Sequence, residues 1–416
     1  MQKTFTAIII FVVGFTLTVS ASDVKRGWNI GPLPAIGYIS DLGFQYGVLC
    51  DFYYYGDGSS FPQYIHKFNF QVSQYTKGSG IFHFFYDSKF LIPSLRVTFA
   101  ASYLPDKMKS FYGFNGFSSP YNDEYSKAFY AIDRNLTRIM ANFQGNLSGN
   151  INWVAGLSFF NYNISRAEDD IDPDLPTLYD HYVNEGVIRP EEAKGGALFE
   201  LKFGAVYDTR DFEPAPSRGT YAELMAFGSP DIIEQKDNAY LKLSAQLCKY
   251  IPLNNRLVFA TRAVYQGTIA GRAPFYMQQN ITTLFLRQIN SEGLGGVNTI
   301  RGVFYNRLVG DGYFWSNSEL RWTVFEFKFL NQNWQAGVNP FFDFGRVVQP
   351  YKLDEMKEAT DNSGIYSGHS EKMHFSAGFG LKAAMNKNFV VSIECAKPFE
   401  AKDGKTGLYF GVNYIF

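Results

Sequence analysis

Apolar and polar residues alternate with a period of two along much of the chain. Phe68, Phe70 and Val72 alternate with polar side chains, and the same pattern recurs at 239–247 and 408–416. Successive side chains of a β-strand point to opposite faces. One apolar and one polar face suit a strand with lipid on one side and water on the other. The pattern therefore predicts β-strands along most of the chain.

Sixteen such segments can be placed, the first at 34–40 and the last at 406–416. Their connections alternate between short ones, such as 147–149, and long ones near 105–125, 164–195, 270–311 and 348–371. Short periplasmic turns, long outer loops and an even strand number are typical of bacterial outer-membrane barrels. A soluble β-sandwich gives similar alternation but has no reason to sort its loops by length. We therefore predict an all-β fold, a transmembrane antiparallel β-barrel of 16 strands.

The composition agrees with a barrel and argues against a nucleic-acid partner. Aromatic residues make up 18% of the chain, with 28 tyrosines and 41 phenylalanines. Transmembrane barrels carry aromatic girdles at both membrane interfaces. The 38 basic and 39 acidic residues nearly cancel, so the sequence offers no basic surface for nucleic acid.

The N-terminus has the features of a secretory signal peptide. Lys3 precedes an apolar run at 7–19, and Ala21 ends a small-residue cleavage site. We predict a signal peptide at 1–21, a short periplasmic segment at 22–33, and the barrel at 34–416.

The sequence favours neither an enzyme nor a cofactor or metal site. The chain has five histidines and no Gly-x-Ser-x-Gly elbow. Its three cysteines, Cys50, Cys248 and Cys395, have neither the spacing of a disulfide framework nor that of a metal site. The acidic cluster at 168–174 could offer oxygen ligands to calcium, but its spacing is not that of an EF-hand, and a solvated loop explains it better.

One arginine stands at the tip of a glycine-rich loop that ends in a strand, the stretch 293–321. Arg301 lies between Ile300 and Gly302. Glu319 and Arg321 lie two residues apart and share a strand face. Asp343 follows in a second strand, NPFFDFGRV.

A buried charge persists only when it is paired and hydrogen-bonded. These positions therefore predict that Arg301 pairs with Glu319 or Asp343 in a confined space. The alternative is an ordinary surface loop with an exposed arginine.

These motifs resemble those of the BamA/TamA family, also called the bacterial surface antigen family. Ile300-Arg301-Gly302-Val303-Phe304 is similar to the family's Val-Arg-Gly-aromatic motif at the tip of the sixth outer loop, although Val303 replaces the aromatic residue. The stretches GYFWSNSELRW, NPFFDFGRV and YDTRDFEPAPSRGTY resemble further family motifs. The chain end, with Val412, Tyr414 and Phe416, resembles the C-terminal signal by which such barrels are inserted.

The resemblance implies a sixth outer loop folded into the lumen, with Arg301 contacting Glu319 or Asp343. It also implies a bacterial outer-membrane location after cleavage near Ala21. The family's periplasmic POTRA domains have no counterpart in the sequence, so we expect a barrel-only member. Expected partners are outer-membrane lipid, the insertion machinery for its own assembly, and a periplasmic or surface protein.

Two functions fit this resemblance. The first is help with protein insertion or translocation through the seam between the first and last strands, where Pro34 cannot donate a ladder hydrogen bond. The alternative is a partly plugged passive channel or a structural subunit of an outer-membrane complex.

Overall fold

The computed structural model describes residues 24–39, 42–61, 63–119, 121–167, 175–213, 215–282, 284, 291–329, 332–351, 370–385, 389–412 and 414–416. The predicted signal peptide at 1–21 and the acidic cluster at 168–174 lie outside these residues. Among the described residues, no helix is both long enough and apolar enough to cross a membrane.

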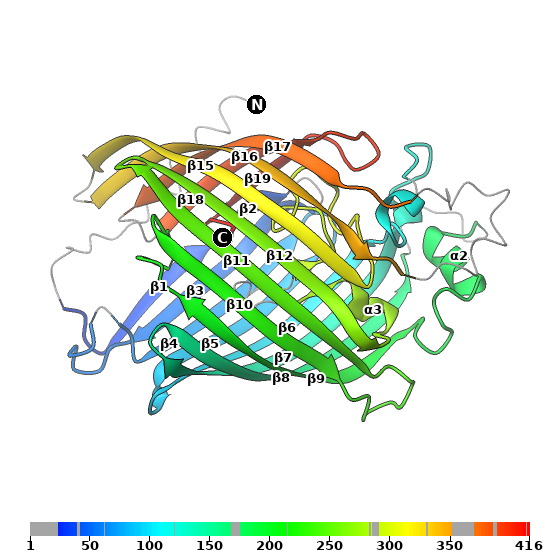
Figure 1. Cartoon of the computed structure of the whole chain (residues 1–416), viewed down its shortest axis with the longest axis horizontal. Helices are drawn as coiled ribbons and strands as arrows, with labels where there is room; N and C mark the ends of the chain where they lie inside the picture. The colour runs from blue at the N-terminus through cyan, green and yellow to red at the C-terminus, as the bar shows by residue number, and fades with distance from the viewer. Residues whose placement is uncertain are drawn as a thin grey trace.

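The chain forms a closed antiparallel β-barrel with loops gathered at one end (Figure 1). The wall strands are β1 (Trp28–Pro34), β2 (Gly37–Ile39), β3 (Gly43–Tyr54), β4 (His66–Tyr75), β5 (Gly80–Ile92), β6 (Leu95–Ser110), β7 (Ala131–Ser148), β8 (Ile151–Arg166), β9 (Gly195–Asp208), β10 (Gly219–Ser229), β11 (Tyr240–Asn254), β12 (Leu257–Gly271), β15 (Gly312–Phe329), β16 (Gln332–Gln349), β17 (His374–Met385), β18 (Phe389–Pro398) and β19 (Gly407–Val412).

Strands β1 and β2 are two parts of one barrel strand. Both pair with β3 in one continuous register, from Trp28 opposite Tyr54 to Ile39 opposite Gly43. Counted together they give 16 strands, and β19 closes the barrel against β2. The predicted strand number and antiparallel closure are confirmed.

The predicted start of the barrel is wrong by six residues. The first strand begins at Trp28, so 28–33 belongs to the wall and not to the expected periplasmic segment. Pro32 and Pro34 concealed this strand, because proline usually argues against one. The strand accommodates both prolines because they lie on its edge, where their missing N–H groups leave the pairing with β3 intact.

The predicted end of the last strand is also wrong. Strand β19 ends at Val412, and residues 414–416 are not part of the sheet. Phe416 is buried, whereas an alternating strand to the end of the chain predicted an outward, lipid-facing side chain.

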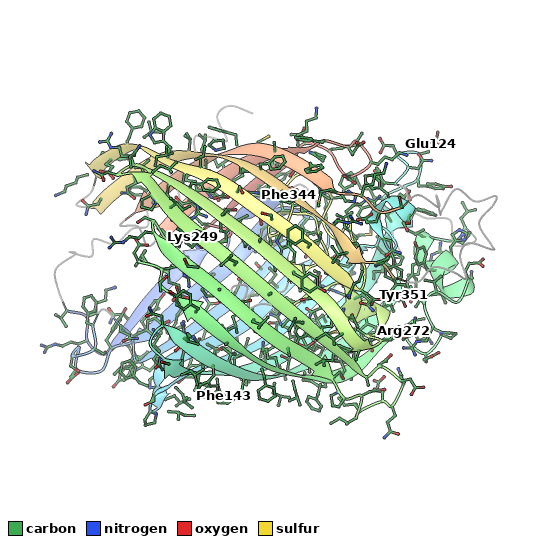
Figure 2. The ribbon with its side chains drawn as sticks, in the orientation of Figure 1. Glu124, Phe143, Lys249, Arg272, Phe344 and Tyr351 are labelled. Atoms are coloured by element: carbon green, nitrogen blue, oxygen red, sulfur yellow. The ribbon has the colours of Figure 1, made fainter. Side chains whose placement is uncertain are left out.

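The wall separates an apolar outside from a polar inside, as the alternation predicts. On β10, Leu224 faces outward with 53% exposure, while the neighbouring Glu223 and Met225 are buried in the lumen. Phe143 and Phe344 lie among the side chains on the outside of the wall (Figure 2). An outward apolar face is the surface that lipid requires.

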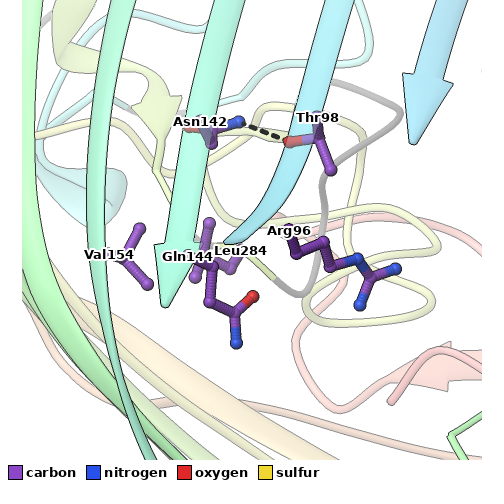
Figure 3. A pocket seen from close by; sticks show the side chains of 6 residues that line it. All are labelled: Arg96, Thr98, Asn142, Gln144, Val154 and Leu284. Atoms are coloured by element: carbon purple, nitrogen blue, oxygen red, sulfur yellow. Dashed lines mark hydrogen bonds between the residues drawn. The ribbon is translucent and has the colours of Figure 1, made fainter. Parts of the chain in front are cut away.

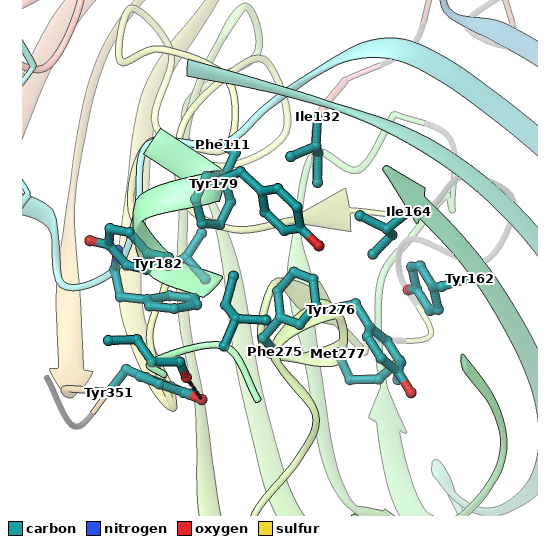
Figure 4. Close-up of a cluster of buried hydrophobic side chains, with 14 of the residues drawn as sticks. Phe111, Ile132, Tyr162, Ile164, Tyr179, Tyr182, Phe275, Tyr276, Met277 and Tyr351 are labelled. Carbon is teal, nitrogen blue, oxygen red and sulfur yellow. Dashed lines mark hydrogen bonds between the residues drawn. The ribbon is translucent and has the colours of Figure 1, made fainter. Parts of the chain in front are cut away.

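The long loops form a packed cap over one end of the barrel. Helix α2 (Leu178–Asn184) begins with a capping box between Thr177 and Asp180. Its Tyr179 and Tyr182 pack with Phe111 and with helix α3 (Phe275–Gln278) (Figure 4). The cap also holds the short helices η1 (Gly116–Ser118) and η2 (Ala128–Tyr130). Because the long loops gather at this end, we assign it to the cell exterior.

Candidate functional site

The sixth outer loop, 272–311, connects β12 to β15 and carries Arg301. This loop, called L6 below, includes α3 and the two-residue strands β13 (Asn280–Ile281) and β14 (Ser291–Glu292). Its residues Ile300, Arg301 and Val303 are all fully buried. Arg301 contacts inward-facing residues of the wall, so L6 enters the lumen.

Arg301 is held by carboxylates from three strands. It donates from Nε to Oδ2 of Asp343 over 2.8 Å and from Nη2 to Oδ1 over 2.9 Å. Its Nη1 donates to Glu319 over 2.7 Å and to Glu394 over 3.3 Å. Such a two-pronged arrangement fits the planar guanidinium and would not fit a lysine ammonium.

Two further residues complete this group, which we call the Arg301 cluster. Arg321 donates to Glu319 over 2.9 Å, and Lys382 donates to Glu394 over 2.9 Å. Three carboxylates therefore face three cations, which limits the cost of burying six charges. Burial lowers the pKa of Arg301, but Asp343, Glu394 and Glu319 raise it well above its ordinary value.

The structure brings Arg301 together with Glu319 and Asp343, and it adds two residues that the sequence reasoning missed. Glu394 lies on β18 between Ile393 and Cys395, and Lys382 follows Leu381 on β17. Each is a charged residue at an inward position of an alternating strand. That position was the available signal, but sequence spacing did not reveal which inward charges would face L6.

Gly302 allows the loop to approach the wall closely. Its φ of +90° lies in the left-handed region, and a Cβ there would come within 3.1 Å of the backbone of Ala396 and Lys397. Its N–H donates to the hydroxyl of Tyr409 on β19 over 2.8 Å. The loop tip thus contacts the last strand of the barrel directly.

The departure from the family motif at Val303 has a packing explanation. Val303 lies in an apolar cluster with Ile300 and Trp315, where its side chain is fully buried. Phe304 instead packs its ring against Tyr112 and Tyr121, at centroid distances of 5.7 and 4.9 Å. The aromatic contact is therefore made one residue later, with the outer loop 111–130.

A second ion-pair group holds the middle of L6 against a different part of the wall. Glu292 accepts hydrogen bonds from Lys109 of β6 and Arg134 of β7. The Lys109 ammonium also lies 4.3 Å from the ring centre of Tyr305. L6 is thus bound to β15, β16 and β18 through Arg301 and to β6 and β7 through Glu292.

Acid should weaken this second group. Burial raises the pKa of Glu292, but Arg134 and Lys109 lower it, to about 2 from its ordinary 4.5. Because the folded pKa is depressed, the stabilisation is present above pH 4.5 and is lost as pH falls toward 2. It corresponds to roughly 3 kcal/mol. We expect Glu292→Gln to lower the temperature at which the barrel unfolds in gel-shift assays at pH 6, and to flatten its decline below pH 4.5.

The exposed carboxylate of Glu326 provides the control, because Glu326→Gln should leave both the unfolding temperature and its pH profile unchanged. Parallel pH profiles for wild type and Glu292→Gln would contradict the assignment.

The lumen wall also carries a small pocket beside L6. It is lined by Arg96, Thr98, Asn142, Gln144 and Val154 of the wall and by Leu284 of L6 (Figure 3). Asn142 donates to Thr98 across it over 3.2 Å. Leu284 shows that L6 approaches this side of the lumen as well.

The seam between the first and last strands is short. Strands β19 and β2 share two residue pairs, Tyr409 with Ile39 and Phe410 with Tyr38. The next junction, between β18 and β19, has six pairs. Fewer paired residues mean fewer backbone hydrogen bonds to break when the strands separate.

Two prolines explain why the seam does not extend along β1. Ala35 donates its N–H to Gly47 of β3 over 3.0 Å. Alternate residues of a strand direct their N–H groups to the same neighbour. Positions 34 and 32 therefore face the seam, and Pro34 and Pro32 have no N–H to donate there.

These features define a class of protein: a membrane β-barrel with a lumenal loop bound through an arginine and a short seam between its terminal strands. Residues 65–416 match the model of the Omp85 superfamily domain. The chain belongs to the Omp85 superfamily. Its members insert or transport proteins, and membership together with the closed barrel indicates a bacterial outer membrane.

Solved structures show the same fold at low sequence identity. BamA from Haemophilus ducreyi lacking POTRA domains 1–3 is 17% identical with a TM-score of 0.59, over 94% of this chain and 70% of that one. CdiB from Escherichia coli is 12% identical with a TM-score of 0.56, over 94% of this chain and 63% of that one. No curated protein sequence matches the chain.

Proposed function

We propose that this barrel assists the insertion or translocation of other proteins at the outer membrane, working with a separate periplasmic or surface protein. The observation that carries the proposal is the seam, where two residue pairs close the barrel. A barrel that only passes solutes has no need for a thin junction in its wall.

The edge of β1 supports the same function. Its seven residues, Trp28–Pro34, pair with β3 on one side, and the two pairs that close the seam lie beyond them, at Tyr38 and Ile39 of β2. Trp28 and Ile30 expose 58% and 62% of their surface, and the Trp28 ring lies against Tyr54 and Phe68 on the outer face of the wall. The first half of this edge can accept an incoming strand by backbone pairing, because Trp28 and Ile30 keep N–H groups on that side whereas Pro32 and Pro34 have none.

The two ion-pair groups of L6 serve as tethers in this proposal. They hold the loop across the lumen when the seam strands β2 and β19 separate. At the loop tip, the N–H of Gly302 donates a hydrogen bond to Tyr409 of β19. The loop is therefore placed to stabilise one side of the seam. We also propose that residues 412, 414 and 416 form the signal for the barrel's own insertion.

Depletion of the protein tests this function. We expect the amounts of several other barrels or surface lipoproteins in isolated outer membranes to fall while their transcripts hold steady. Loss of this protein alone would overturn the proposal.

The second candidate is a partly plugged channel, which the polar inward face of the wall favours. Inward residues such as Lys242, Gln246 and Gln266 are buried against the lumen contents. Planar-bilayer recordings separate the two functions, because steady large openings of the wild-type barrel would favour the channel and brief, rare openings would favour a loop-filled lumen.

A further inference from the structure

The last residue of the chain is buried inside the barrel. Phe416 is 1% exposed and packs with Cys248, Tyr250 and Ala260, which come from β11 and β12. A buried residue outside the sheet needs other partners for its backbone polar groups.

Two buried arginines supply the polar half of that site. Arg321 donates to the backbone oxygen of Phe416 over 2.8 Å, and Arg262 donates to that of Ile415 over 3.2 Å. Both guanidinium groups also lie over the Phe416 ring, 4.8 and 5.1 Å from its centre. Cations over aromatic faces are attracted by the ring. We propose that Tyr250, Arg262 and Arg321 form a docking site for Phe416, beyond the last strand of the wall.

The same two arginines are linked to L6. Arg262 donates to the backbone oxygen of Asn298 in the loop over 2.8 Å. Arg321 donates to Glu319, which also accepts a hydrogen bond from Arg301. The docked residues 414–416 are called the tail below. The tail and the loop share Arg262 directly and Arg321 through Glu319, so the position of one affects the other.

Docking also sets the length of the seam. Continuing the register of β19 on the first strand would place Tyr414 opposite Pro34 and Phe416 opposite Pro32. Neither proline can donate a hydrogen bond to the incoming strand. The tail finds two guanidinium donors in the lumen instead, so the docked tail leaves β1 as an open edge. This inference concerns the barrel's own tail and holds whether or not the seam admits another protein.

Cys248 provides a natural reporter for the docked tail. Its side chain is fully buried in the cluster that contains Phe416, while Cys395 is exposed and Cys50 is half-buried. In barrels refolded in detergent, which do not depend on the insertion signal, and carrying Cys50→Ser and Cys395→Ser, the rate at which a small charged maleimide modifies Cys248 measures access to the site. We expect removal of residues 414–416 to raise this rate about tenfold or more.

The peptide Asn-Tyr-Ile-Phe, added in excess to the shortened barrel, should slow the reaction again by refilling the site. Phe416→Ala provides a second variant that keeps the chain length, and it should raise the rate as well. Ile393→Ala removes a similar apolar side chain from the lipid face and is the control, with no change expected. Equal rates with and without the tail, or no protection by the peptide, would overturn the proposal.

Discussion

Arg301→Ala should destabilise the barrel by about 3–5 kcal/mol, the usual effect of removing one member of a buried ion pair. The substitution leaves Glu319, Asp343 and Glu394 facing each other with only Arg321 and Lys382 as counter-charges. It also removes the hydrogen bonds that hold the tip of L6. The barrel should lose its resistance to heat in gel-shift assays at a lower temperature, and L6 should become sensitive to protease.

Two substitutions make this test specific. Arg301→Lys keeps the charge but cannot bond Asp343 through two nitrogens, so we expect an intermediate loss of stability. Arg256→Ala removes an exposed arginine from the periplasmic turn between β11 and β12, and it should have no effect. Unchanged heat resistance and protease resistance in Arg301→Ala would show that the Arg301 cluster does not tether the loop.

A covalent bond across the seam should abolish the proposed function. Tyr38 and Phe410 are directly paired, and the Cα spacing of such pairs lies within the range of disulfides. In a Cys50→Ser, Cys395→Ser background, the Tyr38→Cys, Phe410→Cys protein should support other barrels normally when reduced. Oxidation should lower those barrels to the level seen on depletion, because the seam can then no longer separate.

The matched control joins two strands that need not part. Phe344 of β16 and Phe375 of β17 are also directly paired, so the Phe344→Cys, Phe375→Cys protein carries the same kind of cross-link elsewhere in the wall. We expect it to function when oxidised. If the oxidised seam variant remains fully active, the barrel works without opening at this junction.

The seam, L6 and the tail form one connected unit in the lumen. Tyr409 of β19 hydrogen-bonds the loop at Gly302, and Arg321 joins the Arg301 cluster to Phe416. A displacement of the last strand therefore changes contacts of both the loop and the tail. This connection is the physical reason to expect Arg301→Ala to alter the seam as well as the loop.

Pro32 and Pro34 account for both misplaced ends of the barrel. Pro32 and Pro34 obscured the first strand, because sequence rules treat proline as a strand breaker unless it lies on an edge. The alternation at 406–416 predicted a last strand that is too long, because a pattern within one strand contains no information about the strand that would pair with it. Only the closed barrel shows that the tail would meet two prolines at the seam and two arginines in the lumen.

The sequence by itself determined the wall: sixteen strands, their outward and inward faces, and the end at which the long loops gather. These properties follow from the alternation of side chains within each strand. Lipid requires the outward residues to be apolar, so the alternation can be read from the local sequence. Only the tertiary structure decided the contents of the lumen: the meeting of Glu394 with Arg301, of Glu292 with Arg134, and of Phe416 with Arg321. Such contacts join segments far apart in the chain, and barrel closure and the path of L6 bring them together.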